Sequence, residues 1–376
     1  MAGLRTAPGT PVEFGHMEGL PLEGVRVLEV GGGIAAAYAT RWLAGYGADV
    51  VRTEGPPDVL TDDETIYLVS GKRRIAADVP QLRALALAAD IVVDDGPPGS
   101  LAERGLDPEG LRREKPPLVV VSITPFGQAG PYAEYRATNI VAHAAGGIMS
   151  LTGLPERPPL QNAGSQAFYL GGLNGFAAAV TAYYGALVQG EGDRVDISMQ
   201  ECAAGMLELF GPRSAYTGEG PVVRSGNHVS AVWGIYQVKD GWGGVCALGR
   251  QIPGLFAAIG DPDLQDERFL DPVKRLENND ELAARMFAWF AERTKQELLE
   301  LGVRYRVPFG AVLTPLELLE NPSLNERGYF DAVETPAGTA RVPGRPFLGF
   351  GWRAGTLHEP AADTHEVVRD WLERGT

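Results

Sequence analysis

The sequence predicts an α/β fold built on a parallel, doubly wound sheet. The first observation is an apolar strand at residues 25–30, three glycines, an alanine-rich helix at 35–45 and a second strand at 49–54, which together form a βαβ unit. The second is that further apolar runs continue the pattern, with strands expected at 75–78, 90–93 and 118–123 and a helix at 81–89. Strands that alternate with helices favour a parallel sheet.

The second half of the chain changes character. Residues 137–215 are mostly helical by pattern, whereas the runs at 233–248 alternate around an Asp-Gly turn and predict a hairpin. Helices dominate 280–301, with Asn279 as N-cap, and strand 307–313 and helix 365–373 follow. We therefore expect an N-terminal extension (1–20), a large domain (21–219), a smaller α+β domain (220–325) and a segment that returns to the large domain (326–376).

Composition excludes several classes of function. The chain has 376 residues, and 33 basic against 48 acidic side chains give a net charge of −15. No basic face is available to bind nucleic acid or an anionic membrane. Two cysteines and five histidines without ligand spacing predict no disulfide framework and no metal site. The N-terminal residues lack the apolar core of a signal peptide, so a cytoplasmic protein acting on a small-molecule substrate is expected.

One long segment lacks charge. Residues 158–190 contain no Asp, Glu, Lys or Arg. A membrane span is one interpretation of such a segment. Its amides and glycines favour the other, in which the segment is buried on several sides or within a subunit interface.

The glycine turn matches a phosphate-binding pattern. Gly31, Gly33 and Ala36 fit G-x-G-x-x-A between a strand and a helix, and Glu54 stands where a ribose-binding carboxylate is found. This favours a dinucleotide or S-adenosylmethionine site. The alternative is a tight turn of the kind that any α/β protein contains.

A few side chains suit catalysis or anion binding. His143 lies within residues 137–190, where Glu156 and Arg157 are the only Asp, Glu, Lys or Arg, and a buried neutral imidazole there would serve as a general base or as a core residue with satisfied hydrogen bonds. Residues 72–74 (KRR) follow a glycine on a loop, and they would either grip a phosphate or form ordinary surface charge. No G-x-S-x-G motif supports a hydrolase triad.

A series of short motifs runs along most of the chain. They are PLEGVRVLEV at 21–30, GADVV at 47–51, GKR at 71–73, PG at 98–99, GLD at 105–107, G-x-x-GPY at 127–132, TG-x-P at 152–155, VDISM at 195–199, VP-x-G-x-V at 307–312 and PG-x-P at 343–346. In this order they resemble the class III CoA-transferases, which include formyl-CoA and carnitine-CoA transferases and alpha-methylacyl-CoA racemases. The resemblance implies a Rossmann-like large domain, a smaller domain and an interlocked homodimer.

The resemblance places unexpected residues at the catalytic positions. Family transferases use an aspartate that forms an acyl anhydride and then a thioester with CoA, and this position is Phe168 here. The His-Asp pair of the racemases is replaced by Thr138 and Asn139, and His143 stands where the family usually has glutamine. His143, Asn139 and Phe168 are therefore the candidate catalytic positions.

The positions that resemble the CoA site are also altered. By resemblance, CoA would contact Gly33, Ile34 and Ala35 at the glycine turn, Lys72 and Arg73, Asp95, and Arg104. An Asn-Phe pair of the family reads Asp95-Gly96, and an arginine position reads Glu103, with Arg104 adjacent. Each charge-assisted hydrogen bond lost in this way costs about 1.5–3 kcal/mol, so binding of CoA or an acyl-CoA is expected to be weakened.

Four functions follow from these observations. The main expectation is a class III CoA-transferase fold without the aspartyl nucleophile, repurposed for lyase, dehydratase or isomerase chemistry. The alternatives are an acyl-CoA transferase or racemase with an atypical active site, a non-catalytic scaffold, and a nucleotide or S-adenosylmethionine binder. The resemblance disfavours the last, since relatives use the same turn without that cofactor.

Overall fold

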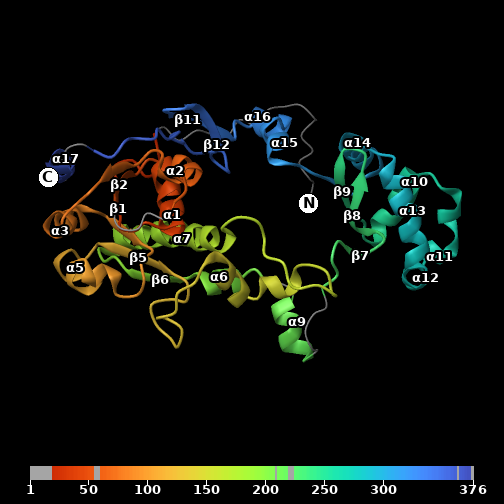
Figure 1. The fold of residues 1–376 in the computed structure, drawn as a ribbon, viewed down its shortest axis with the longest axis horizontal. Helices are drawn as coiled ribbons and strands as arrows, with labels where there is room; N and C mark the ends of the chain where they lie inside the picture. The colour runs from red at the N-terminus through yellow and green to blue at the C-terminus, as the bar shows by residue number, and fades with distance from the viewer. Residues whose placement is uncertain (1–18, 55–59, 208–209, 219–223, 362–363, 374–376) are drawn as a thin grey trace. The chain divides into compact units, whose positions relative to one another are not determined.

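The computed structural model describes residues 19–54, 60–207, 210–218, 224–361 and 364–373 (Figure 1). Their contacts divide the chain into two compact units. The first combines the described parts of residues 1–148, 161–209 and 326–376, and the second those of 149–160 and 210–325. Residues 149–160 and 210–218 thus group with the second unit. The sequence-based domain bounds stay a prediction about folding units.

A six-stranded sheet forms the centre of the first unit. Its strands are β1 (Arg26–Glu29), β2 (Asp49–Thr53), β3 (Arg73–Ile75), β4 (Ile91–Asp94), β5 (Val119–Thr124) and β6 (Arg194–Ser198). They lie in the order β3-β2-β1-β4-β5-β6, and every pair is parallel. The predicted parallel, doubly wound sheet is therefore confirmed. Because the strand order reverses between β1 and β4, a crevice is expected at the carboxyl ends of these strands.

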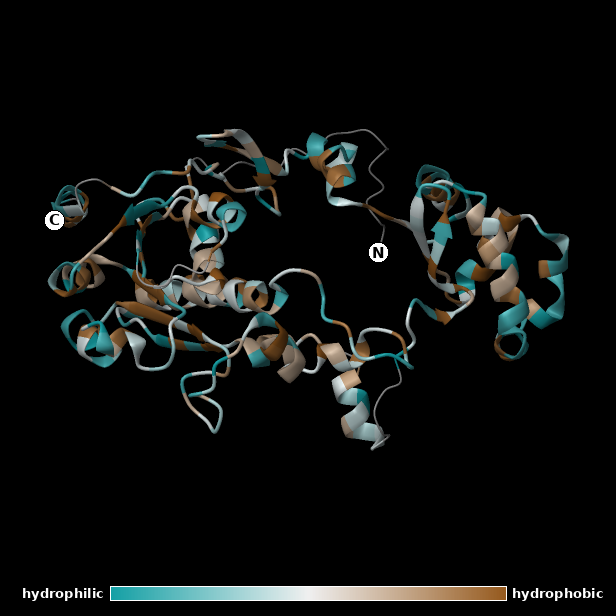
Figure 2. Ribbon diagram, in the orientation of Figure 1, coloured by the Kyte–Doolittle hydropathy of each residue, from teal (hydrophilic) through white to brown (hydrophobic). Residues whose placement is uncertain are grey.

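The sheet is buried on both faces. Successive strand residues point to opposite faces, so Val27 packs with helices on one side and Leu28 with helices on the other. All six residues of β5 are buried, and Figure 2 draws this strand largely in brown. This explains why the strands read as continuous apolar runs.

The helices of the first unit cover these two faces. They are α1 (Ile34–Gly45), α2 (Asp62–Val69), α3 (Val79–Ala88), α4 (Ser100–Glu103), α5 (Pro108–Glu114), α6 (Asn139–Ala145), α7 (Gln166–Gln189), α8 (Met199–Ala204) and α17 (Thr364–Glu373). The core of one face includes α1 and α7, and that of the other includes α3, α5 and α17. Trp371 of α17 is completely buried there, and its Nε1 donates to Asp49 at 3.0 Å.

Glycines allow α7 to approach α1 and the sheet. A Cβ atom at Gly172 would lie 2.6 Å from the carbonyl oxygen of Ala35, and one at Gly175 would lie 2.6 Å from Cδ1 of Ile123. Backbone and core atoms cannot move far enough to accept these groups. Gly172 and Gly175 of the charge-free segment are therefore positions of close helix packing.

The pattern for residues 137–215 missed one strand. The range holds α6, α7, α8, the short 3₁₀ helix η1 (Ile148–Leu151) and α9 (Phe210–Thr217), but β6 lies between α7 and α8. β6 is the edge strand of the sheet, and Arg194 and Asp196 on it are exposed. Its polar residues conceal the strand from a pattern based on apolar runs. In the first unit, β11 (Phe330–Thr335) and β12 (Gly338–Pro343) form a separate, two-stranded antiparallel sheet.

The second unit has its own sheet and core. Antiparallel strands lie in the order β10-β9-β8-β7. Their bounds are β7 (His228–Ser230), β8 (Trp233–Val238), β9 (Gly241–Cys246) and β10 (Phe309–Val312). The predicted hairpin is confirmed: Val238 pairs with Gly241, whose φ of 140° is one that glycine tolerates.

Helices and short 3₁₀ segments occupy much of residues 249–326, and the buried core beside this sheet includes Leu255, Phe290 and Leu298. These elements are η2 (Gly249–Gln251), α10 (Ile252–Ile259), η3 (Pro262–Gln265), α11 (Glu267–Leu270), α12 (Pro272–Glu277), α13 (Asn279–Ala291), α14 (Lys295–Tyr305), α15 (Pro315–Leu319) and α16 (Pro322–Glu326). Asn279 was expected to be the N-cap of α13, but Asn278 takes that place. The Asn279 side chain instead accepts a hydrogen bond from the backbone of Ala231 at 2.8 Å.

Among the described residues, no helix combines the length and the apolar character that crossing a bilayer requires.

A buried ion cluster lies beneath the glycine turn. Glu29 at the end of β1 is completely buried and accepts from Arg52, from Lys72 at 2.9 Å and from Thr40 at 2.6 Å. Lys72 also donates to the carbonyl of Ala37 at 2.7 Å. Burial would raise the pKa of Glu29, but the two cations outweigh it and hold this pKa below its usual value. Burial lowers the pKa of Lys72 to about 8.

Removing the anion of this cluster tests how much the unit depends on it. Glu29→Gln leaves Arg52 and Lys72 buried without a carboxylate, so we expect a loss of about 3–5 kcal/mol in the free energy of unfolding, measured by urea titration with circular dichroism. The control is Glu114→Gln, which breaks an exposed pair with Arg83 and is expected to cost less than about 1 kcal/mol. Equal losses in the two variants would contradict the assigned role of Glu29.

Candidate functional site

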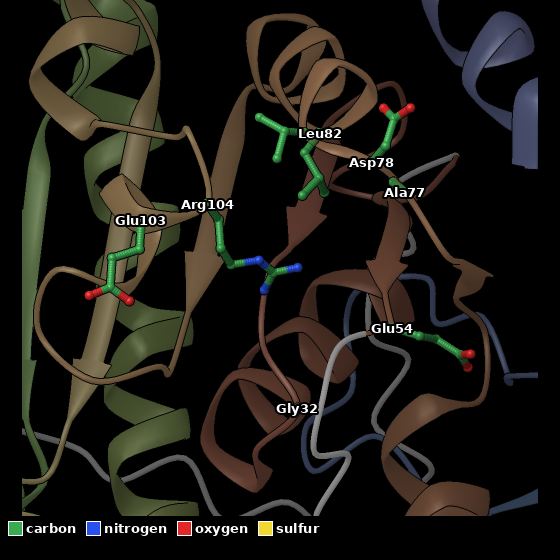
Figure 3. Close-up of a pocket in the computed structure, with 8 residues that line it drawn as sticks. Gly32, Glu54, Ala77, Asp78, Leu82, Glu103 and Arg104 are labelled. Carbon is green, nitrogen blue, oxygen red and sulfur yellow. The ribbon is translucent and has the colours of Figure 1, made fainter.

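A cavity of about 580 Å³ opens at the carboxyl ends of the parallel strands. It is lined by Gly32, Glu54, Ala77, Asp78, Val79, Leu82, Glu103 and Arg104 (Figure 3). Gly32 follows β1, Glu54 follows β2, and Glu103 ends α4. This is the edge of an open α/β sheet where ligands bind.

Arg104 is the cation of this cavity. Figure 3 shows its guanidinium between Glu103 and Glu54, with the carboxylates of the acidic side chains turned away from it. Two of these carboxylates have partners of their own. Glu54 pairs with Arg74 at 2.5 Å, and Asp78 accepts from the backbone of Gln81 at 2.9 Å as the N-cap of α3. A long 3.4 Å contact joins Arg104 to Thr53, which leaves the guanidinium suited to an anionic ligand.

The glycine turn holds a carboxylate of the chain itself. Asp95 follows β4 and accepts from the backbone N–H of Gly33 at 3.2 Å and of Ala36 at 3.0 Å. A Cβ atom at Gly31 or at Gly33 would lie within 2.3 Å of the Asp95 carboxylate. The glycines are therefore required for the approach of Asp95. The position where an anion binds to the first turn of a helix is occupied by this side chain.

Asp94 shares the same strand end. Its side chain is buried and accepts from the hydroxyl of Ser100 at 3.2 Å. Burial, and then the negative charge of Asp95, raise the pKa of Asp94 to about 7. Burial likewise raises the pKa of Asp95, against the hydrogen bonds from Ala36 and Gly33. Asp94, the last residue of β4, and Asp95, which follows it, thus both have raised pKa values.

The other residues assigned to CoA by resemblance lie apart from the cavity lining. Lys72 belongs to the buried ion cluster described above. Arg73 begins β3, and it pairs with Asp49 at the start of β2 and with Asp370 at 2.9 Å. Because β2 and β3 are parallel, Arg73 lies toward the amino ends of the strands, and the cavity lies at their carboxyl ends. A role for these two cations in anion binding stays a prediction.

Phe168 lies in a cluster of aromatic side chains. It is half-buried near the start of α7 and packs on a buried core of Ile34, Ala37 and Leu68, where Tyr38, Tyr67 and Tyr169 also pack. The rings of Tyr38 and Tyr169 meet edge to face at 4.7 Å. We call Ile34, Tyr38, Tyr67, Phe168 and Tyr169 together the aromatic cluster. It brings together α1, α2 and α7, so Ile34 of the predicted CoA site and Phe168 of the predicted catalytic site share one environment.

Asn139 and His143 lie on α6, one turn apart. The Asn139 side chain accepts from the backbone of Ala167 at 2.9 Å and donates to the carbonyl of Gly164 at 3.1 Å, so it holds the first turn of α7. His143 is 1% exposed, and neither ring nitrogen has a hydrogen-bond partner among the described residues. The burial of His143 agrees with the prediction of a buried imidazole. A histidine that serves only as a core residue was expected to have its hydrogen bonds satisfied, which is not the case here.

The cavity and the aromatic cluster contain residues that sequence reasoning missed. Asp78 and Leu82 enter the cavity from α3, and Tyr38, Tyr67 and Tyr169 form the cluster. Only Tyr38 and Tyr169 could have been suspected, since they stand four residues and one residue from predicted site residues. Among the described residues, no group of three or more His, Cys, Asp and Glu gathers in a way that suits a metal ion.

Comparison with known proteins gives the family. The model of "CoA-transferase family III" matches residues 22–366. The chain belongs to CoA-transferase family III. A succinyl-CoA–D-citramalate CoA-transferase of Chloroflexus aurantiacus is 31% identical over 342 residues, which cover 84% of each chain. A formyl-CoA:oxalate CoA-transferase of Streptomyces avermitilis is 29% identical over 386 residues, covering 87% of this chain and 92% of the relative.

A solved structure supports the fold of this family III member. A CaiB/BaiF family protein from Brucella suis matches with a TM-score of 0.81 and 27% identity, covering 94% of this chain and 100% of that one. The family predicted from the short motifs is thus confirmed. The assignment of the family nucleophile position to Phe168 stays a prediction.

The elevated pKa of Asp94 predicts a pH-dependent stability. In the unfolded chain Asp94 ionises near pH 4, while the folded protein keeps its proton to about pH 7. The folded state therefore binds more protons between these values, and this contribution to stability is lost as the pH rises through that window. Asp94→Asn removes this loss, so we expect the stability of the variant relative to the wild type to be greater at about pH 8 than at about pH 4.5. Urea unfolding at both pH values measures it, and an unchanged difference would contradict the prediction.

Proposed function

We propose that this family III chain is a CoA-transferase that moves CoA between a small acyl thioester and a small carboxylic acid. The observation that carries the proposal is the similarity to CoA-transferases over most of both chains. These relatives are named for succinyl-CoA with D-citramalate and for formyl-CoA with oxalate. A short carboxylate is therefore the substrate class that we infer here.

The similarity favours the transferase over the repurposed enzyme that the sequence suggested. Lyase, dehydratase or isomerase chemistry was expected because Phe168 stands at the aspartate position. The named relatives instead support transfer with an atypical active site. Phe168 then lies beside the reacting groups, where it excludes water from an anhydride or thioester intermediate.

The cavity at the strand ends supports binding of the nucleotide part of CoA. Its volume of about 580 Å³ falls within the range of small-molecule sites. Arg104 offers a guanidinium to a phosphate, and Glu54 stands at the end of β2, where a ribose hydroxyl would donate to it. The N-terminus of α1 already carries the Asp95 carboxylate, so Arg104 is the phosphate contact that we assign.

Replacing Arg104 tests this binding site. Arg104→Ala removes one charge-assisted contact of about 1.5–3 kcal/mol, so CoA should bind about 10- to 100-fold more weakly in a calorimetric titration. Arg113→Ala, at a position that is 78% exposed, serves as the control and should bind CoA as the wild type does.

A transfer assay tests the function itself. Succinyl-CoA and formyl-CoA are offered as donors, with D-citramalate and oxalate among a panel of short carboxylates as acceptors, and new thioesters are followed by mass spectrometry. Transfer with at least one pair supports the proposal. Absence of both CoA binding and transfer would instead favour the repurposed enzyme or the scaffold.

We further propose that the chain works as a homodimer that covers one face of α7. Leu173, Ala177, Thr181, Tyr184 and Val188 follow one another at spacings of three or four residues, and all are exposed. Tyr184 is 68% exposed and Val188 65%. A charge-free, apolar face on a helix of 24 residues is typical of a buried contact with another chain.

Charge placed on this face should separate the subunits. Tyr184→Glu buries a carboxylate in the proposed contact, so we expect the sedimentation velocity of the variant to report a monomer where the wild type is a dimer. Leu276→Glu in the second unit, at a side chain that is also 68% exposed, is the control and should leave the dimer intact. A monomeric wild type would contradict the proposal directly.

A further inference from the structure

Covalent CoA transfer needs a carboxylate that the charge-free segment does not contain. A carboxylate conserves the energy of the thioester, because it exchanges with the acyl group as an anhydride and then accepts CoA as a new thioester. Phenylalanine has no atom that forms either bond. Since residues 158–190 include no Asp or Glu, the carboxylate must come from another element that packs against the aromatic cluster.

Helix α2 presents a carboxylate on the face that meets this cluster. Glu64 stands three residues before Tyr67 and four before Leu68, so the three side chains share one side of the helix. Leu68 is completely buried, and Tyr67 of the aromatic cluster packs on the core that includes it. Leu60, beside the N-cap of α2, packs on the same core. Glu64 is therefore bracketed by residues that contact this cluster.

The negative charge of Glu64 affects Tyr169, the residue next to Phe168. Burial, and then the negative charge of Glu64, raise the pKa of the Tyr169 phenol to about 12. Tyr169 directly follows Phe168 in α7, and its ring meets Tyr38 of α1. The Glu64 carboxylate thus acts on the same environment that holds the family nucleophile position.

Glu64 is held in place with one oxygen left over. Its Oε2 accepts from the backbone N–H of Thr61 at 2.9 Å and from the Thr61 hydroxyl at 3.0 Å. No hydrogen bond to Oε1 is formed by the described residues. A half-buried, oriented carboxylate with a free oxygen is what an attack on a thioester requires.

Other carboxylates near the start of α1 are committed to the fold. Glu29 neutralises two buried cations, and Asp95 holds the first turn of α1. Asp331 pairs with buried Arg41 at 2.8 Å and accepts from Trp352. Attack by any of these would break a buried ion pair or a helix cap, whereas Glu64 keeps its Oε2 contacts while Oε1 reacts.

We propose, on the basis of the transferase function above, that Glu64 is the catalytic nucleophile of this chain. Its Oε1 attacks the thioester carbonyl, the carbon–sulfur bond breaks, CoA leaves as a thiolate, and an acyl-glutamyl anhydride forms. The thiolate attacks the glutamyl carbonyl, which releases the donor acid as a carboxylate and leaves a glutamyl-CoA thioester. The acceptor carboxylate repeats the sequence in reverse order and restores Glu64. No proton, electron or further reactant is consumed.

Trapping the thioester in the wild-type protein tests the assignment. The enzyme is incubated with the donor that supports transfer, treated with borohydride, which reduces a glutamyl thioester to an alcohol, and digested for mass spectrometry. We expect the reduced side chain at Glu64. Reduction at another carboxylate, or transfer without any reduced residue, overturns the assignment and leaves the transferase function standing. Absence of transfer refutes the function first, so the two failures differ.

Substitution gives a second readout. Glu64→Gln should lower kcat for transfer by at least about 10³-fold while CoA still binds, because the amide keeps the size and a cap acceptor but is no nucleophile. Glu297→Gln is the matched control, since Glu297 occupies the same position in the capping box that Thr294 forms at the start of α14. It replaces the same kind of cap carboxylate by an amide and should keep full activity. Equal activity of the two variants overturns the role of Glu64.

Discussion

The close packing of α7 against α1 is the constraint on which the candidate site depends. Gly172 lets α7 approach the backbone of α1, Gly175 lets it approach the side chain of Ile123 in β5, and a Cβ atom at either position would clash. As a result the N-terminal part of α7 shares a hydrophobic core with the start of α1 and with the last turn of α2. Tyr169 meets Tyr38 because of this approach, and Asn139 holds the first turn of α7 from α6.

The carboxylates near the sheet divide into those that stabilise the fold and those that line the cavity. Glu29 and Asp95 are tied to buried cations and to backbone N–H groups, so their charge belongs to the fold. Glu54 and Glu103 line the cavity beside Arg104. The net negative charge of the chain therefore does not by itself repel a phosphate at the carboxyl ends of the strands, since part of that negative charge is neutralised by buried cations of the first unit.

Local patterns predicted the βαβ unit, the parallel sheet and the hairpin of the second unit, because apolar runs and turn residues carry that information along the chain. Partners distant in sequence were harder to foresee. Lys72 looks like a loop cation, yet it pairs with Glu29 forty-three residues earlier. Asp95 looks like a charge that opposes phosphate, yet it caps α1 across sixty-two residues. The edge strand β6 was missed because its residues alternate in polarity. Spacing along the chain does not reveal such contacts before the sheet is assembled.

The first unit is built from separated stretches of chain, and its core closes only near the end of the sequence. Trp371 of α17 is buried against one face of the sheet and donates to Asp49 of β2, whereas the second unit draws almost all of its residues from an internal stretch. During synthesis the internal unit can complete its core while the ribosome is still at work. The large unit must wait for residue 371, so the part of its core that Trp371 fills stays incomplete while the internal unit folds.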